Sequence, residues 1–156
     1  MQRQGVAESY KMACARLLES KWQACSFEIP LFDGSKNLRA DVMAIDQSLS
    51  FTIIEVKSCK ADFTTDKKWP LYLGFCHRFY FCSDPKTLEK ISSEILKTEY
   101  AKHVGLIAVD PETLEAKIVK PSKARYDTQI PAEGQLLRLM IWNNRPTAST
   151  LTDSRQ

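Results

Sequence analysis

The stretch Phe51-Thr52-Ile53-Ile54-Glu55-Val56-Lys57 is rich in β-branched and aromatic residues, a composition typical of a β-strand. Side chains two positions apart in a strand point to the same face, so the glutamate and the lysine at its end share one face. Residues 38–45 form a second candidate strand, and Asp46-Gln47-Ser48 between the two runs is typical of a turn. The two strands are therefore predicted to be antiparallel neighbours.

This pairing would bring Asp41 close to Glu55, although the sequence leaves the partner of Asp41 open between Phe51 and Glu55. The two carboxylates and the Val56 carbonyl are oxygen ligands of the kind that Mg²⁺ prefers. Lys57 can orient or help deprotonate a metal-bound water, or stabilise negative charge that develops on a phosphate. The pattern thus indicates a divalent-metal phosphodiesterase site. The alternative for so short a pattern is an ordinary hairpin with solvated charges.

The predicted order of elements resembles the PD-(D/E)xK nuclease superfamily. On this resemblance Asp41 is the first motif acid, Ala40 stands where the superfamily name has proline, and Glu55 and Lys57 complete the motif. A closer resemblance, to the MmcB-type DNA repair family within that superfamily, covers about Arg39 to Asp110. It is carried by Asp62-Phe63, Asp66-Lys67-Lys68-Trp69-Pro70-Leu71-Tyr72, Phe75-Cys76, Phe79-Tyr80-Phe81, Gly105-Leu106-Ile107 and Asp110. His77, where the family pattern leads us to expect an acid, and the more helical and charged segment Asp84–Lys102 depart from it.

The resemblance implies an α/β fold with a restriction-endonuclease-like core, a central mixed β-sheet flanked by helices in the order α-β-β-β-α-β. It implies a DNA endonuclease or repair nuclease that hydrolyses phosphodiester bonds, with Asp41, Glu55 and Lys57 as catalytic residues. Asp41, Glu55 and Val56 would bind Mg²⁺, for which Mn²⁺ could substitute. Relatives often place a glutamate of the first helix at this site, and Glu8 is the candidate, although helical periodicity puts it away from the apolar stripe.

DNA is the expected partner, and the resemblance is compatible with a homodimer and with contacts to other DNA repair proteins. Lys60, Lys67 and Lys68 are predicted to contact the nucleic-acid backbone, because they flank the predicted metal site. A second basic cluster, Lys117, Lys120, Lys123 and Arg125, is more typical of a solvated face. Two alternatives stay open, an inactive nucleic-acid-binding module that keeps the nuclease fold and an adaptor protein.

The chain has 156 residues, of which 44% are hydrophobic and 26% charged, as in a soluble globular protein with its own core. We expect a single domain over residues 1–142 and a disordered tail over residues 143–156.

The five cysteines form no CxxC pair, which favours reduced thiols over structural zinc. Met1-Gln2-Arg3-Gln4 is not typical of a signal peptide, and no apolar run reaches about 20 residues, so a cytoplasmic location and no membrane contact are expected.

An apolar stripe at helical spacing predicts an N-terminal helix. The stripe consists of Val6, Tyr10, Ala13, Cys14, Leu17 and Leu18, and Trp22 is expected to close it. A helical stretch is predicted between Ala61 and Phe75, with Pro70 near a helix start or at a kink. Trp69 and Tyr72 are expected to pack on the sheet rather than stack on a base. The other predicted elements are strands at Cys25–Leu31, Arg78–Cys82, Val104–Val109 and Ala116–Val119 and a helix at Gly134–Trp142.

Overall fold

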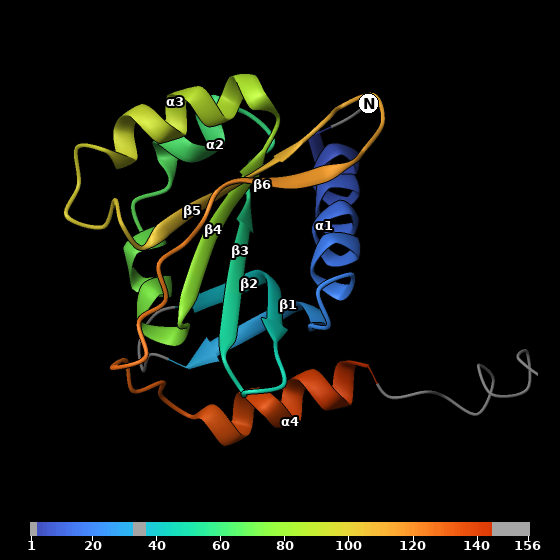
Figure 1. Ribbon diagram of the computed structural model, residues 1–156, viewed down its shortest axis with the longest axis vertical. Helices are drawn as coiled ribbons and strands as arrows, with labels where there is room; N and C mark the ends of the chain where they lie inside the picture. The colour runs from blue at the N-terminus through green and yellow to red at the C-terminus, as the bar shows by residue number, and fades with distance from the viewer. Residues whose placement is uncertain (1–2, 33–36, 145–156) are drawn as a thin grey trace, which may run out of the picture.

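The computed structural model, which describes residues 3–32 and 37–144, contains a six-stranded sheet in the order β1-β2-β3-β4-β5-β6 (Figure 1). The strands β3, β4 and β5 run parallel to one another, and the pairs β1–β2, β2–β3 and β5–β6 are antiparallel. The strands are β1 Ala24–Phe32, β2 Asn37–Ile45, β3 Phe51–Val56, β4 Arg78–Ser83, β5 Val104–Val109 and β6 Ala116–Lys120. The prediction of a central mixed sheet is confirmed.

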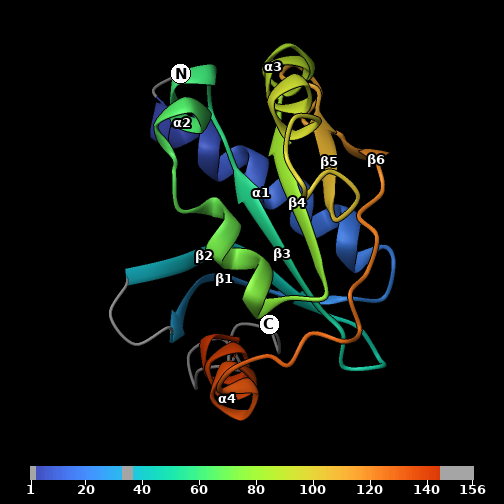
Figure 2. The ribbon, with the colours of Figure 1, turned by 90° about the vertical axis from the view of Figure 1, so that its left-hand side faces the viewer.

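Helices cover both faces of this sheet (Figures 1 and 2). Helix α1 (Arg3–Glu19) lies on one face, and on the other lie α2 (Lys60–Thr65), the 3₁₀ helix η1 (Trp69–Phe75) and α3 (Pro85–Ile95). Helix α4 (Glu133–Asn143) packs against β1. The predicted α/β architecture is therefore present.

Two apolar cores lie on the two faces of the sheet. The core under α1 is formed by residues such as Cys14, Leu18, Val42, Ile54 and Cys82. The opposite core contains more aromatic rings, with Phe51, Trp69, Phe79 and Phe81 packed against Ile91 of α3. Burial of these side chains is the main favourable contribution to folding.

The β1–β2 hairpin changes the core that it contacts halfway along its length. Phe27 and its partner Val42 face the α1 core, whereas Ile29 and its partner Ala40 face the opposite core. Between these pairs Glu28 has a φ of 55°, a left-handed conformation that is uncommon for a residue other than glycine. The strand therefore turns its side chains over beside Asp41, the residue opposite Glu28 in this register.

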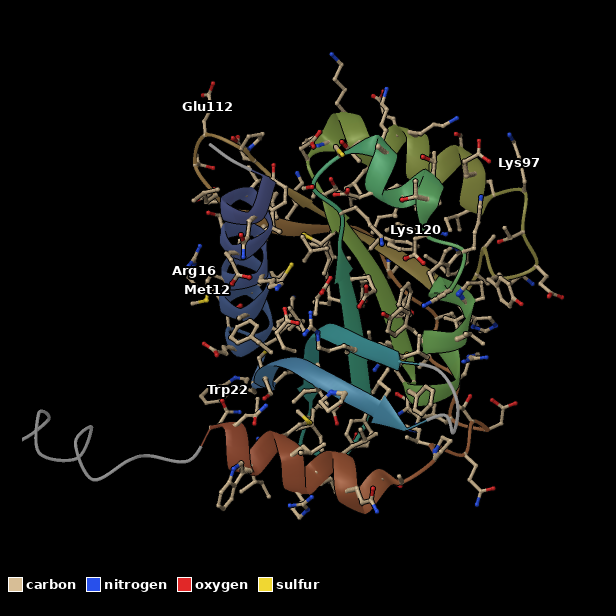
Figure 3. All side chains as sticks on the ribbon, turned by 180° about the vertical axis from the view of Figure 1, so that it is seen from behind. Met12, Arg16, Trp22, Lys97, Glu112 and Lys120 are labelled. Atoms are coloured by element: carbon tan, nitrogen blue, oxygen red, sulfur yellow. The ribbon has the colours of Figure 1, made fainter. Side chains whose placement is uncertain are left out.

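Two sequence predictions were wrong in detail. The predicted helical stretch Ala61–Phe75 is interrupted, because α2 ends at Thr65 and η1 begins at Trp69. The Asp66 carboxylate accepts the backbone N–H groups of Lys68 and Trp69, and such local bonds compete with helix continuation. Trp22 does not close the stripe of α1, since it is 82% exposed and projects outward (Figure 3).

Other predictions agree with the structure. Pro70 lies in the first turn of η1, and Trp69 and Tyr72 are both buried. All five cysteines are unpaired. Asn143, the last residue of α4, and Asn144 after it belong to the predicted tail of residues 143–156, and residues 145–156 lie outside the described part of the chain. Among the described residues, no helix has the length and apolar character to cross a membrane.

Candidate functional site

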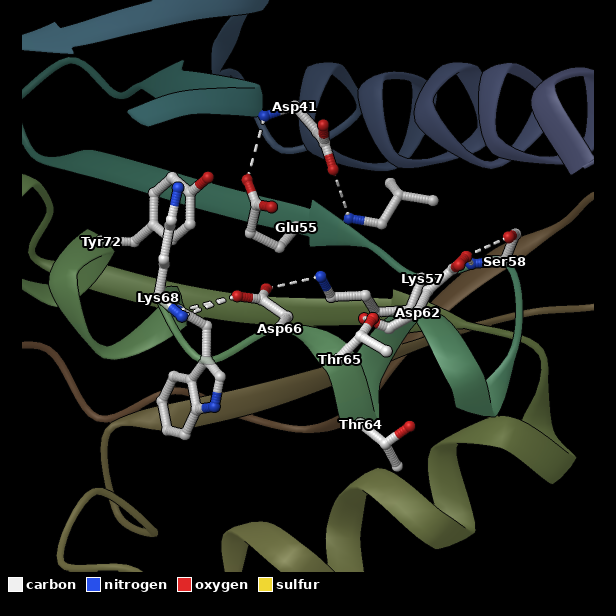
Figure 4. Close-up of polar contacts among 12 residues, drawn as sticks. Asp41, Glu55, Lys57, Ser58, Asp62, Thr64, Thr65, Asp66, Lys68 and Tyr72 are labelled. Carbon is white, nitrogen blue, oxygen red and sulfur yellow. Dashed lines mark hydrogen bonds and ion pairs between the residues drawn. The ribbon is translucent and has the colours of Figure 1, made fainter. Parts of the chain in front are cut away.

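Asp41 and Glu55 lie side by side on neighbouring strands. Val42 of β2 pairs with Ile54 of β3, and continuing that antiparallel register by one residue places Asp41 opposite Glu55. The Asp41 backbone N–H donates to Glu55 Oε1 at 3.1 Å, and the Val56 backbone N–H donates to Asp41 Oδ2 at 2.8 Å (Figure 4). The three residues of the predicted metal site are therefore close together in the fold.

The carboxylate pair is short of positive charge. Glu55 is only 5% exposed and Asp41 is half-buried. Burial raises the pKa of Glu55 well above its usual value, and the Asp41 carboxylate raises it further. Burial also raises the pKa of Asp41, although the Val56 N–H opposes the rise. Within residues 3–32 and 37–144, neither carboxylate forms an ion pair with a cationic side chain.

Lys57 follows directly on β3, and its ammonium group is paired with Asp66. The distance from Lys57 Nζ to Asp66 Oδ2 is 2.6 Å, and both side chains are largely buried. The Lys57 N–H donates to the Cys82 carbonyl at 2.9 Å, and the Ser83 hydroxyl donates to the Lys57 carbonyl at 2.5 Å. Cys82 and Ser83 of β4 thus fix the backbone of Lys57, and Asp66 fixes its side chain.

A second charged group lies on the α1 side of Asp41. The Lys11 ammonium donates to Glu8 at 2.9 Å and to Glu28, and Glu28 also pairs with Arg39 Nε at 2.6 Å. Burial alone would lower the pKa of Lys11, but the bonds to Glu28 and Glu8 outweigh it and the pKa is raised. The negative charge of Asp41 also raises the pKa of Lys11, so Lys11 lies close enough to influence the carboxylate pair.

The structure places Glu8, the predicted additional acid, in this second group. Its carboxylate contacts Lys11, and its side chain is 63% exposed. Lys11 and Glu28 were missed as site residues. The available signals were a lysine within the apolar stripe of the first helix and a glutamate inside an apolar strand. Asp66 is part of the family pattern, but nothing in the sequence indicates its contact with Lys57.

The predicted nucleic-acid contacts lie at the surface. Lys60 is in α2, and Lys67 and Lys68 are in the connection from α2 to η1. All three side chains are exposed. Their side chains have no hydrogen-bond or ion-pair partner in the part of the chain that the structure describes. These three lysines can therefore contact a bound anion without breaking an existing bond.

The second basic cluster is partly committed to internal bonds. Lys120 donates to the carbonyls of Ala101 and Val104, and Arg125 donates to that of Leu73. Lys117 and Lys123 are exposed. Lys120 and Arg125 therefore hold segments of the protein together. Lys117 and Lys123 are consistent with the predicted solvated face.

The described residues contain no group of three or more His, Cys, Asp or Glu side chains arranged to hold a metal ion. The set predicted from the sequence has a different composition, with two carboxylates and one backbone carbonyl. Asp41 and Glu55 are the side chains of that set, and their oxygen atoms are the donors that a hard cation prefers.

Comparison with known proteins gives a family and a fold. The model of the family described as DNA repair protein MmcB-like matches residues 3–136. The solved structure of the SPO1766 protein of unknown function from Silicibacter pomeroyi is similar, with a TM-score of 0.64 and 23% sequence identity. The match covers 99% of this chain and 89% of that protein. A search of the curated proteins found no match.

Proposed function

The chain belongs to the MmcB-like DNA repair protein family, and from this premise we propose that it is a divalent-metal-dependent deoxyribonuclease that hydrolyses phosphodiester bonds. The observation that carries the proposal is the contact between Asp41 and Glu55 on neighbouring strands, without a cationic partner for either carboxylate in the described residues. The buried Glu55 carboxylate and the half-buried Asp41 carboxylate repel each other, so a divalent cation would relieve a charge imbalance that the protein itself leaves.

The donor set fits Mg²⁺, with Mn²⁺ as a substitute. Asp41 and Glu55 would hold the ion through carboxylate oxygens, and the Val56 carbonyl, next in sequence to Glu55, would be the third protein ligand. Mg²⁺ usually keeps several waters and takes one or two carboxylates from a protein, which suits so small a set. When bound, the ion would supply Lewis-acid stabilisation of phosphate charge and a water of lowered pKa.

Lys57 would supply the remaining positive charge. It lies two residues after Glu55 at the end of β3, and its ammonium can orient a water or stabilise negative charge on a phosphate oxygen. For either role the ammonium must share its bond to Asp66 with the phosphate or the water. Asp66 would then act as a positioning residue, since it holds the Lys57 ammonium in place.

The same ion pair favours a second candidate function. An ammonium 2.6 Å from Asp66 is already neutralised, as expected of a nuclease-fold protein that binds DNA without cutting it. In this alternative the exposed lysines of α2 and the connection to η1 would bind the DNA backbone. The carboxylate pair would take no part in hydrolysis, whether or not it holds a metal ion.

The test is incubation with Mg²⁺ or Mn²⁺ and a panel of single-stranded, duplex, flapped and branched DNAs. Glu55→Gln is the active-site variant, and Glu112→Gln, at an exposed glutamate (Figure 3), is the matched control. We expect Glu55→Gln to lower the cleavage rate by roughly a hundredfold or more, as for removal of a group that stabilises transition-state charge. The control should cut like the wild type.

Metal binding is measured separately, so that a protein that fails to cut can be distinguished from one that fails to bind the ion. Mn²⁺ binding, followed by electron paramagnetic resonance, should be lost in Asp41→Asn and retained in Glu112→Gln. Metal binding and DNA binding without cleavage of any substrate would favour the non-catalytic candidate. Cleavage at the wild-type rate by Glu55→Gln would show that the hydrolysis does not depend on this site.

A further inference from the structure

A cleft of about 470 Å³ lies between the α2–η1 segment and α3. One of its lining residues is Asp66, the ion-pair partner of Lys57, so the cleft adjoins the candidate site. We infer that this cleft binds one unstacked nucleotide of a DNA strand. The inference rests on the proposed function, because it assigns to that site a DNA substrate with an unpaired nucleotide.

Aromatic side chains form part of the cleft wall. The aromatic lining residues are Phe63, Trp69 and Tyr100. The rings of Trp69 and Tyr100 pack edge to face, with their centroids 5.5 Å apart. Phe63 and Trp69 are buried, whereas Tyr100 is half-buried and keeps exposed surface. Stacking of a base on an aromatic side chain contributes about 1–3 kcal/mol and tolerates any base. The aromatic wall therefore suits any of the four nucleobases.

Cationic side chains come from both sides of the cleft. Lys67 lies between α2 and η1, and Lys90 lies on α3. The Lys67 side chain has no hydrogen-bond or ion-pair partner among the described residues, and Lys90 Nζ lies 3.2 Å from Glu94 Oε1. An aromatic wall with lysines on either side is the arrangement that single-strand-binding proteins use for a base and its flanking phosphates.

The size of the cleft selects an unpaired nucleotide. Its volume falls in the range of pockets that hold one small molecule, about 300–1,000 Å³. The stacked and paired bases of a duplex cannot enter such a space, and enzymes that need access to one nucleotide of a duplex must extrude it. Flapped, single-stranded or damaged DNA, in which a base is already unstacked, is therefore the expected substrate class.

The first test maps binding without any divalent metal. A ¹⁵N-labelled sample of the whole chain is titrated with a short oligodeoxythymidylate and followed by amide chemical shifts. The shifts are expected at residues that line the cleft, such as Thr64, Lys67 and Tyr100. Shifts confined to other parts of the protein, or none at saturating oligonucleotide, would overturn the inference.

The second test compares two lysines that share one partner. Lys90 and Lys97 both bond to Glu94, at 3.2 and 3.3 Å, but only Lys90 lines the cleft. Lys97 lies at the outer surface (Figure 3). We expect Lys90→Ala to weaken oligonucleotide binding about three- to tenfold, and Lys97→Ala to change it less than about twofold. Equal effects of the two substitutions would exclude the cleft as the binding site.

A third variant blocks the cleft. Thr64 is an exposed residue of the cleft wall and points toward α3 (Figure 4), so Thr64→Trp should fill the space without disturbing the core. Thr65→Trp is the control, since Thr65 is also exposed but does not line the cleft. Thr64→Trp is expected to weaken binding at least about fivefold relative to Thr65→Trp. Equal binding by both variants would contradict the inference.

The outcomes separate this inference from the proposed function. Cleavage of paired and unpaired DNA at equal rates, unaffected by Lys90→Ala and Thr64→Trp, would overturn the cleft inference and leave the nuclease proposal standing. Binding in the cleft with no cleavage of any DNA would overturn the nuclease proposal and leave the cleft as a nucleotide-binding site.

Discussion

The Lys57 ammonium lies 2.6 Å from the Asp66 carboxylate, and this ion pair connects the end of β3 to the start of η1. The second oxygen of the same carboxylate accepts the backbone N–H groups of Lys68 and Trp69. One side chain therefore fixes the orientation of Lys57 and the start of the 3₁₀ helix. The two contributions can be separated by substitution.

Asp66→Asn should destabilise the protein less than Asp66→Ala. The amide keeps an oxygen that can accept the two N–H groups and removes only the charge, for which we expect a loss of about 1.5–3 kcal/mol in the free energy of unfolding. Alanine also removes the acceptor of the Lys68 and Trp69 N–H groups, which should cost about 1 kcal/mol more. Urea unfolding measures both, with Asp127→Asn at an exposed site as the control. Equal losses for the two variants would show that these two hydrogen bonds contribute nothing to stability.

Lys57→Ala should lower DNA cleavage strongly and leave DNA affinity within a few-fold of the wild type. One lysine supplies little of a binding energy that comes from many phosphates, but this lysine lies where negative charge develops. The measurements are single-turnover cleavage and fluorescence anisotropy, with Lys60→Ala as a second lysine variant near the site. A Lys57→Ala protein that cuts at the wild-type rate would leave Lys57 as a structural partner of Asp66.

The sequence predicts the sheet well, for a physical reason. Phe51–Val56 is buried throughout and Val104–Val109 at every position but Ala108. The β-branched and apolar composition of these runs identifies them as strands without any knowledge of their partners. The adjacency of Asp41 and Glu55 also followed from a short turn between two strands. Only the register was open, and the pairing of Val42 with Ile54 supplies it.

The charged contacts could not be predicted in this way. Lys11 and Glu28 are 17 residues apart and lie in different elements, and they meet only because α1 packs across the sheet. The left-handed backbone conformation of Glu28 in β1 could not be predicted either, because no residue near it in the sequence indicates a positive φ. Helical periodicity identified the apolar stripe of α1 but gave no partner for the lysine within it.

Lys11 and Glu28 should show a strong energetic coupling. Lys11→Met leaves Glu28 beside Asp41 without its buried cation, and we expect it to lower the free energy of unfolding by about 1.5–3 kcal/mol. Once Glu28→Gln is present, Lys11→Met should cost less, because the bond that it removes no longer involves two charges. A double-mutant cycle measured by urea unfolding gives the coupling. Additive effects would mean that the Lys11–Glu28 ion pair contributes nothing to stability.

Cys59 should be the first thiol to react in the folded protein. It is half-buried, whereas the other four cysteines are buried. Burial raises the pKa of Cys25 and of Cys76 to about 12, so at pH 8 both stay in the unreactive thiol form. Titration with a chromogenic disulfide reagent at pH 8 should give one fast equivalent, and Cys59→Ser should abolish it. A fast equivalent that survives in Cys59→Ser would indicate that a buried thiol is accessible.

The double variant Lys67→Ala/Lys68→Ala should bind DNA of every sequence more weakly and with a shallower salt dependence. Both lysines are exposed without a side-chain partner in the described residues, so their charges are available to the DNA backbone. Removal of one lysine–phosphate interaction should reduce the slope of log affinity against log salt by about 0.7–0.9. The measurement is anisotropy of labelled DNA at several salt concentrations.

The control for this variant is Lys117→Ala/Lys123→Ala, which removes the same charge from two other exposed lysines. If net charge alone mattered, both double variants would show the same decrease in affinity and in slope. We expect the decrease only for Lys67→Ala/Lys68→Ala, because these two residues lie in the segment that joins Asp66 to η1, next to the carboxylate pair and Lys57. The opposite result, with the decrease confined to Lys117→Ala/Lys123→Ala, would move the DNA-binding surface to the β6 side of the sheet.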